Sequence, residues 1–180
     1  MHLIPAQLDE SNLLINKDRL IQNTLKDLED YISRQTNRET LRILLSTQNY
    51  LRRSNFKYND ILPISIGDVC YIDFGQAYLN EAGYQHYGLI IALMNGKAFV
   101  VPMTSNALAY QQAYDELENH QGKRHLMRFG QIHGLNKPSV LFLNDSKFIN
   151  TSRIIEVKGH ISIIDPLFIK IKQRVYQCIL

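Results

Sequence analysis

Short apolar runs alternate with turn residues in the middle of the chain, between Gly67 and Ser105. Three segments there, GDVCYIDFG, HYGLIIAL and AFVVPMTSN, are rich in valine, isoleucine, phenylalanine and tyrosine, and polar stretches separate them. This pattern is typical of short antiparallel strands. Asn95 and Gly96, between the second and third runs, are the pair that a type I′ turn favours because both positions have positive φ. The pattern predicts a three-stranded meander that curls into a small barrel.

The predicted hairpin also makes neighbours of two polar positions. Residues at equal distances from a hairpin turn face each other. Counting outwards from the turn places the neighbourhood of His86 beside that of Thr104, where both apolar strands end. We therefore expect these two positions to lie side by side.

Helical periodicity marks residues 16–54, where leucine and isoleucine recur at spacings of three and four. The predicted apolar faces hold Ile21, Leu25, Leu28 and Ile32 in the first helix and Leu41, Leu44, Leu45 and Leu51 in the second. Thr36 and Glu39 have the spacing of a capping box, so the helices break near Gln35, and Asn16 is a possible cap for the first. We expect an antiparallel helical pair.

The rest of the chain predicts two helices and three further strands. A helix is expected over Asn106–Asn119, capped by Asn106, and strands over 124–132, 139–144 and 153–163, with Gly159 as a possible bulge. Asp165 followed by a proline begins a terminal helix. Its apolar stripe is Phe168, Ile171, Val175 and Ile179.

These elements predict an α+β fold that is mainly antiparallel β. Residues 1–62 form an N-terminal helical extension and residues 63–180 a barrel domain with a C-terminal helix, because Asn55, Asn59 and Pro63 open a linker. A chain of 180 residues with 45% hydrophobic content can bury such a core. No apolar run approaches the roughly 20 residues that cross a bilayer, and no signal peptide is evident, so a cytoplasmic protein is expected.

Charge changes this picture only locally. The net charge of +3 does not by itself indicate nucleic-acid binding. Lys123, Arg124, His125 and Arg128 fall within six positions, however, and form either a basic rim beside the barrel or a solvated edge. Cys70 and Cys178 are not closely spaced, so both are expected to be buried free thiols.

Three segments together resemble the MazF/PemK family of toxin ribonucleases. They are GDVCYIDFG at Gly67–Gly75, VPMTS within Val100–Ser105, and KPSVLFLNDSKFINTSRI at Lys137–Ile154. The resemblance covers residues 65–180 and leaves the N-terminal helices outside. In the family an Arg-Pro pair precedes the second strand, and this chain has His86 and Tyr87 at those positions.

The resemblance implies an SH3-like barrel that forms a homodimer and is restrained by an antitoxin. It implies cleavage of single-stranded RNA, such as mRNA, without a metal or other cofactor, leaving a cyclic phosphate and a free 5′ hydroxyl. It also implies that the threonine ending the third strand, here Thr104, is part of the catalytic site.

Such cleavage needs proton carriers and donors that stabilise the charged phosphorane. His86 is the first candidate for proton transfer, with His125 or His133 as the second. Thr104 and Ser105 would hydrogen-bond phosphate oxygens. Positive charge would come from Arg124, Arg128 and Lys147, and no zinc-type histidine spacing is present.

Structural alternatives accompany these assignments. His86 can instead be a partly buried histidine bonded to a backbone carbonyl, and Thr104 can cap the helix that follows. Tyr84 and Tyr87 can stack on unpaired bases or pack across strands. Asp68 and Asp73 are expected to be structural acids, although either can orient a histidine.

Two functions remain open from the sequence. The leading one is a toxin-type endoribonuclease. The alternative, motivated by the missing Arg-Pro pair, is a silent toxin-like barrel that acts as an RNA-binding or protein-interaction module. The N-terminal helices either form a packing or oligomerisation layer or cover the RNA groove in place of an antitoxin. Their mixed charges favour packing.

Overall fold

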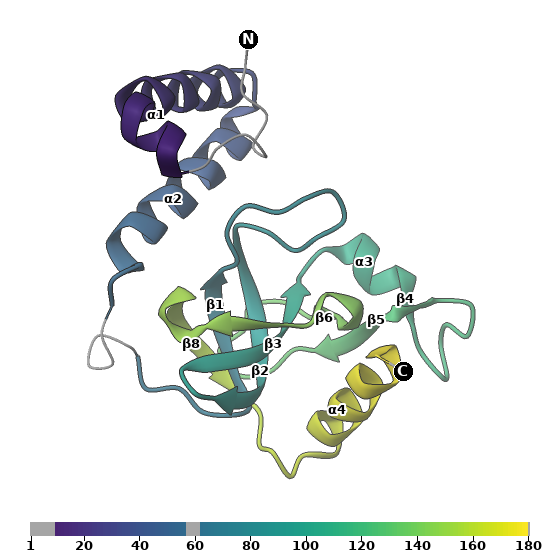
Figure 1. Cartoon of the computed structure of the whole chain (residues 1–180). Helices are drawn as coiled ribbons and strands as arrows, with labels where there is room; N and C mark the ends of the chain where they lie inside the picture. Colours follow the sequence, from purple (N-terminus) through teal and green to yellow (C-terminus); the bar gives the residue numbers. More distant parts are fainter. Residues whose placement is uncertain (1–9, 57–61, 180) are drawn as a thin grey trace. The chain divides into compact units, whose positions relative to one another are not determined.

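The computed structural model describes residues 10–56 and 62–179 and divides the chain into two compact units, Met1–Leu44 and Leu45–Leu180 (Figure 1). The unit that contains the sheet therefore starts inside the second helix. The boundary at residue 62 stays a prediction. None of the described helices is long and apolar enough to cross a membrane.

Two consecutive helices open the described chain, α1 (Glu10–Ser33) and α2 (Asn37–Arg53). The first begins before the predicted start, and its backbone leaves the helical conformation at Asn16 (φ −127°, ψ 17°), so the expected cap position is a kink. The break between the helices lies where it was predicted. The Thr36 hydroxyl accepts a hydrogen bond from the Glu39 N–H at 3.3 Å, which confirms this cap.

The predicted apolar face of α2 is wrong. Its leucines are exposed: Leu41, Leu44, Leu45 and Leu51. The buried residues of this helix are instead Ile43 and Ser46. Ser46 donates a hydrogen bond to a carboxylate of the sheet, and Arg53 Nη1 donates to the Ile154 carbonyl at 2.8 Å. Polar hydrogen bonds thus orient the second half of α2, and a pattern of hydrophobic residues cannot predict them.

One curled sheet forms the centre of the larger unit. Its strands are β1 (Asp68–Asp73), β2 (Gln85–Met94), β3 (Lys97–Thr104), β4 (Ala113–Tyr114), β5 (Lys123–Gly130), β6 (Ser139–Phe142), β7 (Lys147–Asn150) and β8 (Ile154–His160). Within the described residues their order is β4-β5-β6-β3-β2-β1-β8, and β7 also pairs with β3. Every pairing is antiparallel except that of β4 with β5. The α+β, mainly antiparallel prediction is confirmed.

The sheet curls until β8, at one end of the strand order, contacts the segment after β5, near the other end, although no strand pairing among the described residues closes the barrel. Gly134, in the segment after β5, lies against β8 with φ +91°. A Cβ atom there would be 1.9 Å from the Lys158 carbonyl oxygen, so only glycine allows this approach. The barrel-like curvature therefore depends on a backbone contact between β8 and the segment that follows β5.

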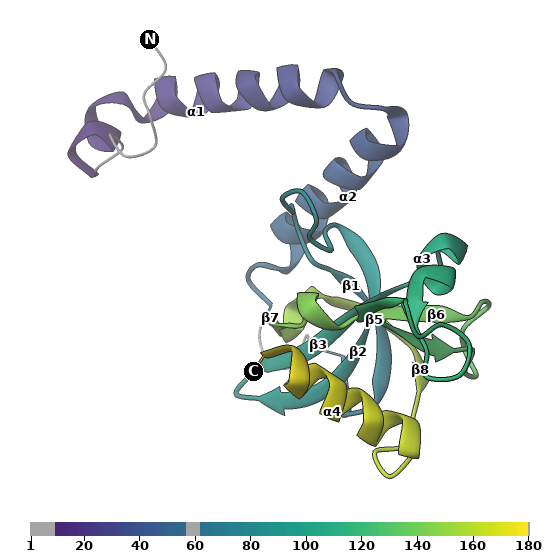
Figure 2. The ribbon, with the colours of Figure 1, turned by 90° about the vertical axis from the view of Figure 1, so that its right-hand side faces the viewer.

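Two larger apolar clusters occupy the two faces of the sheet. One includes Leu89, Met103, Leu141 and the residues Phe168, Ile171 and Val175 of α4 (Pro166–Ile179), which lies against the sheet in Figure 2. Asp165 Oδ1 accepts from the Leu167 N–H at 2.8 Å, which confirms the predicted cap. The other cluster holds Cys70, Ile72, Ile90, Ala98, Val100, Ile149 and Ile154.

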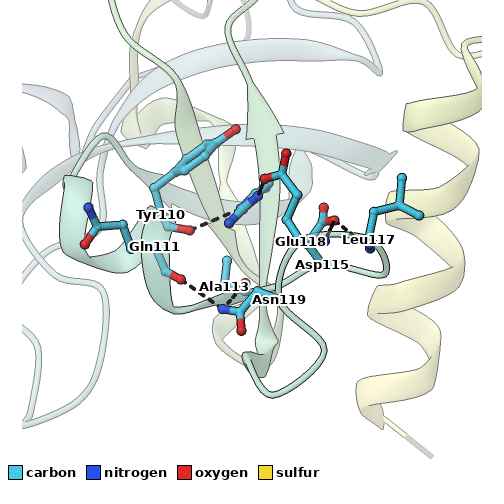
Figure 3. A network of polar contacts seen from close by, with 8 residues as sticks. Tyr110, Gln111, Ala113, Asp115, Leu117, Glu118 and Asn119 are labelled. Atoms are coloured by element: carbon cyan, nitrogen blue, oxygen red, sulfur yellow. Dashed lines mark hydrogen bonds and ion pairs between the residues drawn. The ribbon is translucent and has the colours of Figure 1, made fainter.

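The helix expected over Asn106–Asn119 is shorter than predicted. The Asn106 side chain caps α3 (Ala107–Gln112) as expected, accepting from two backbone N–H groups. Asn119 Nδ2 then donates to the carbonyls of Gln111 and Ala113 at 2.9 and 3.1 Å (Figure 3). These bonds satisfy carbonyls at the helix end, and the chain turns into β4, which pairs with β5.

Local turn chemistry was predicted correctly. Asn95 and Gly96 both have positive φ, 48° and 74°, between β2 and β3. The pairing of β1 with β8 shifts register beside Gly159, where a bulge was expected. Among the cysteines, Cys70 is buried, and burial followed by the nearby Asp68 charge raises its pKa to about 12. Cys178, in the last turn of α4, is exposed, which contradicts the prediction.

Candidate functional site

Strand register places His86 between β1 and β3 on one face of the sheet. His86 pairs with Ile72 of β1. On its other side Tyr87 pairs with Met103, so His86 and Thr104 are the next residues along β2 and β3. The predicted neighbourhood of His86 and Thr104 is therefore confirmed by the register of the hairpin.

The same row continues across two more strands. Thr104 pairs with Val140 of β6, and Val140 pairs with Arg128 of β5. Directly paired residues of antiparallel strands point to the same face. His86, Thr104 and Arg128 consequently share one face and one line across the sheet. Neighbouring strands lie about 4.8 Å apart, so the backbones of Thr104 and Arg128 are separated by about 10 Å. We call these three residues the cross-strand row.

The first two members of the row are half-buried, so a ligand at the surface can reach them. His86 and Thr104 are each partly accessible, and Ser105 is exposed. The Thr104 hydroxyl accepts a hydrogen bond from the Asn106 N–H at 3.3 Å. This contact matches the structural alternative for Thr104. It leaves the hydroxyl hydrogen available to donate elsewhere, because the bond uses Thr104 only as an acceptor.

Arg128 is held at one end of the row by three contacts. Its Nε donates to the Tyr110 carbonyl at 3.3 Å, and its guanidinium carbon lies 5.0 Å from the centre of the Tyr110 ring. Its Nη1 forms an ion pair with Glu118 (Figure 3). The Arg128 side chain is only 17% exposed and that of Glu118 is 73% exposed. Glu118 is therefore the partner that an incoming anion would displace.

The loop that carries Glu118 is internally ordered. Asp115 Oδ1 accepts from the N–H groups of Leu117 and Glu118 at 2.9 and 3.0 Å (Figure 3). These hydrogen bonds lower the pKa of Asp115. Asp115 and Asn119 also exchange two backbone hydrogen bonds, so the turn presents Glu118 in a defined position.

Lys147 lies near the other side of the row. It forms an ion pair with Asp145 at 2.9 Å, and its Nζ lies 5.9 Å from the centre of the Phe74 ring. A Cβ atom on Gly88 would be 3.4 Å from the end of that ring. Gly88 follows His86 by two residues and so faces the same side of β2. The structure thus brings Lys147 to the face that carries the cross-strand row.

Asp73 supports the strand end that carries His86. Its carboxylate is buried and accepts from Ser46 Oγ and Asn49 Nδ2 at 2.7 Å each, from Gln85 Nε2 at 3.0 Å and from the Gly75 N–H at 2.9 Å. Burial alone would raise its pKa, but these hydrogen bonds outweigh burial and lower it. Asp73 is therefore a structural acid, as expected, and it fixes Gln85 next to His86.

Asp68 also has a structural role, and it contacts a histidine that sequence reasoning did not single out. Its Oδ1 lies 2.7 Å from His160 Nδ1, and its Oδ2 accepts from the Ser65 N–H at 2.7 Å. This pair joins the start of β1 to the end of β8, away from the cross-strand row.

Several predicted residues are not on the row. His125 precedes Leu126 on β5, so strand alternation directs it to the face opposite Arg128. His133 follows β5, with its carbonyl oxygen close to Gly159. Tyr87 packs against Tyr71 with ring centres 5.2 Å apart, which matches the cross-strand alternative.

Two further predicted residues lie near the row without joining it. Tyr84 adopts φ +55°, a conformation that is strained for a tyrosine, two residues before His86. Its backbone closes the loop between β1 and β2, donating to the Gly75 carbonyl at 2.6 Å. Arg124 is at the start of β5, four residues from Arg128. Sequence reasoning missed Tyr110 and Glu118, because their segment was expected to be one long helix.

Comparison with known proteins finds similar solved structures but no similar sequence. No protein-family model matches the chain, and no curated protein matches its sequence. MazF from Deinococcus radiodurans is 14% identical with a TM-score of 0.49, over 67% of this chain and 98% of that one. An endoribonuclease from a mycobacterial species is 10% identical (TM-score 0.45, covering 66% and 93%). A mycobacterial endoribonuclease in complex with its cognate antitoxin is 12% identical (TM-score 0.44, covering 66% and 95%).

At these identities and TM-scores, function has to be argued from the residues of the site. The first of these structures bears the name of the family that the sequence resembles, MazF.

Proposed function

We propose that this protein is a toxin-type endoribonuclease that cleaves single-stranded RNA, including mRNA, without a metal ion. The observation that carries the proposal is the cross-strand row, which aligns His86, Thr104 and Arg128 on one face of the sheet. A base, a hydroxyl donor and a guanidinium are the groups that cleavage through the 2′ hydroxyl requires. The resemblance of residues 65–180 to the MazF/PemK family supports the same reaction.

The chemistry follows from the order of groups along the row. The His86 imidazole takes the proton of the 2′ hydroxyl, whose oxygen attacks the adjacent phosphorus. Thr104, with Ser105 beside it, donates hydrogen bonds to the phosphate oxygens, and Arg128 neutralises their growing negative charge. The bond to the 5′ oxygen breaks, and that oxygen takes a proton from solvent. The products are a 2′,3′-cyclic phosphate and a free 5′ hydroxyl.

The RNA-binding surface extends from the row on both sides. Lys147 supplies charge on the face of the sheet that carries His86, and Arg128 and Arg124 supply it along β5. Tyr84, two residues before His86, would stack on a base next to the cleaved phosphate. The side chains of Tyr87 and His125 lie on the opposite face of the sheet. They would reach RNA only where it passes the ends of β2 and β5.

A cognate antitoxin and a homodimer belong to the proposal through the family resemblance. An antitoxin restrains a ribonuclease whose free activity would harm its own cell, and the proposed location is the cytoplasm, where mRNA is present. A second copy of the chain would complete the binding surface.

The test is incubation of the purified full chain with a long single-stranded RNA in EDTA, followed by mapping of the cut ends. We expect cyclic phosphate ends from the wild type, loss of at least about a hundredfold in rate for His86→Ala, and little change for the exposed control His120→Ala. Equal activity of wild type and His86→Ala would remove His86 from the mechanism. Cleavage that requires added metal would refute the metal-free reaction.

A silent binding module is the second candidate. It is favoured by two observations: His86 and Tyr87 replace the Arg-Pro pair, and Arg128 is engaged by Glu118. It predicts that the folded wild type, free of any copurified inhibitor, binds RNA without cutting it and that His86→Ala binds equally well.

A further inference from the structure

A second basic site lies at the start of β5, on the side of the sheet that α4 covers, and it is built from three different elements. The guanidinium carbons of Arg124 and Arg174 lie 5.4 and 5.3 Å from the centre of one ring, that of Tyr114. Arg174 Nη2 also donates to the Arg124 carbonyl at 2.5 Å. Thus β4, β5 and α4 each contribute one residue to what we call the paired-arginine site.

The two arginines are not neutralised by the protein. Within the described residues, neither forms an ion pair with a carboxylate. The nearby acids are engaged elsewhere, since Glu116 pairs with Lys170 and Glu118 with Arg128. Two guanidinium groups beside one ring, without a counter-charge, create a local positive potential that favours an anion.

The chemistry of the site selects phosphate over a base. The Tyr114 ring already has both guanidinium groups against it, so it is not open for stacking. What remains available is the N–H edge of each guanidinium, whose fork matches two oxygens of a phosphate. Arg124 is exposed and Arg174 is half-buried, so these edges are accessible from solvent.

The position of the site connects it with the cross-strand row. Arg124 and Arg128 are four residues apart on β5, with backbones about 13 Å apart. Arg128 contacts Tyr110, whereas Arg124 packs with Tyr114 and Arg174 on the side of the sheet that α4 covers, where the pairing of β4 with β5 shifts register. A single strand that passes Arg128 reaches Arg124 by turning around the edge of the sheet formed by β4. A flexible chain with a phosphate at every residue can span this short distance, which favours nucleic acid over small anions.

We propose that Arg124, Arg174 and Tyr114 form a phosphodiester-binding subsite that holds single-stranded RNA beyond the cleavage point. Arg174 is the new member, supplied by the C-terminal helix, and Tyr114 keeps the two guanidinium groups in place. This inference rests on the proposed function for the identity of the ligand, but it concerns binding and not cleavage.

The test uses an RNA that cannot be cut. An oligouridine with 2′-O-methyl groups lacks the attacking hydroxyl, so fluorescence anisotropy measures its binding independently of catalysis. Each phosphate contact on a single strand contributes about 0.7 to the slope of log affinity against log salt. We expect Arg124→Gln or Arg174→Gln to lower the slope by about 0.7 and the double variant by about 1.4.

Lys172→Gln is the matched control, because it removes one charge from α4 at an exposed position two residues from Arg174, on a different side of the helix. It should leave the slope unchanged. Arg174→Lys keeps the positive charge and should therefore keep the salt slope of binding, although it loses the paired N–H donors of the guanidinium group. If Arg174→Gln fails to fold by circular dichroism, the exposed Arg124→Gln decides the test.

Three outcomes would overturn the inference. The first is an unchanged salt slope of binding in folded Arg124→Gln, and the second is a salt slope that falls equally in Lys172→Gln. The third is displacement of the oligouridine by poly-glutamate at equal charge, which would assign the site to an acidic protein partner. A wild type that binds the oligouridine with the expected slopes but does not cut unmodified RNA would refute the nuclease and leave this subsite standing.

Discussion

Replacing Asp73 by asparagine should destabilise the sheet unit through a carboxylate that lies outside the apolar core. Four donors converge on Asp73, and three of them are the side chains of Ser46, Asn49 and Gln85. A hydrogen bond to a charged group contributes about 1.5–3 kcal/mol, against about 0.5–1.5 kcal/mol for a neutral one. An asparagine amide also presents an NH₂ group with two donors where the carboxylate presents only acceptors.

The expected net loss is smaller than the sum of these bonds. Removing the charge also removes the cost of burying it, and the amides of Asn49 and Gln85 can turn to accept from the new NH₂ group. We therefore expect the free energy of unfolding to fall by about 2 kcal/mol at neutral pH. For a chain of this length, that corresponds to a melting temperature lower by roughly 4–8 °C.

The pH dependence has a definite sign. The pKa of Asp73 in the folded protein lies below its usual 3.8, so the wild type gains stability from this group at pH values above that value. The gain is lost as the pH falls through the folded pKa. Asparagine does not titrate, so the stability difference between wild type and Asp73→Asn should shrink on acidification.

Urea unfolding of the full chain, followed by circular dichroism at neutral pH and at about pH 3, measures both effects. Asp30→Asn, at an exposed position of α1, is the matched control and should differ from wild type by less than about 0.5 kcal/mol. Equal stability of Asp73→Asn and wild type at neutral pH would refute the reasoning. So would a difference that widens as the pH falls.

Two other substitutions test the curvature of the sheet and the access to Arg128. Gly134→Ala should lower the free energy of unfolding by about 3 kcal/mol or more, because its Cβ would meet the Lys158 carbonyl. Gly96→Ala is the control: it also has positive φ, but no atom lies within 4 Å of its Cβ, so it should cost about 1–2 kcal/mol. Equal losses of the two variants in thermal unfolding would contradict this. Glu118→Gln should raise the affinity for uncleavable RNA by up to about fivefold, because it removes an ion pair with Arg128 that is worth up to about 1 kcal/mol. If fluorescence anisotropy shows weaker binding instead, Glu118 positions Arg128 for RNA.

Those parts of the fold that depend on adjacent residues were predictable from the sequence. Asn95 and Gly96 determine their turn through backbone conformation, and the pairing of His86 with the neighbourhood of Thr104 follows by counting from that turn. Asp165 likewise begins α4 through its own side chain. In each case the decisive interaction spans only a few residues or one hairpin.

The rest depends on contacts between distant segments. Arg128 joins the row only because β6 lies between β3 and β5, and strand order is not contained in local patterns. The helix expected up to Asn119 ends early because that asparagine bonds carbonyls six and eight residues before it, although the segment favours helix by composition. The buried side of α2 contains Ser46, whose partner Asp73 is 27 residues further along.

The hydrogen bonds from α2 to the sheet also determine where the protein can be divided for experiments. A shortened chain that starts at residue 63 would lack Ser46 and Asn49, and so would leave Asp73 with two of its four donors missing. It would also expose the Ile154 carbonyl, which Arg53 covers in the full chain. A chain that starts at Thr36 keeps the helix cap and all of these donors, and it is the shorter form in which activity without α1 should be measured.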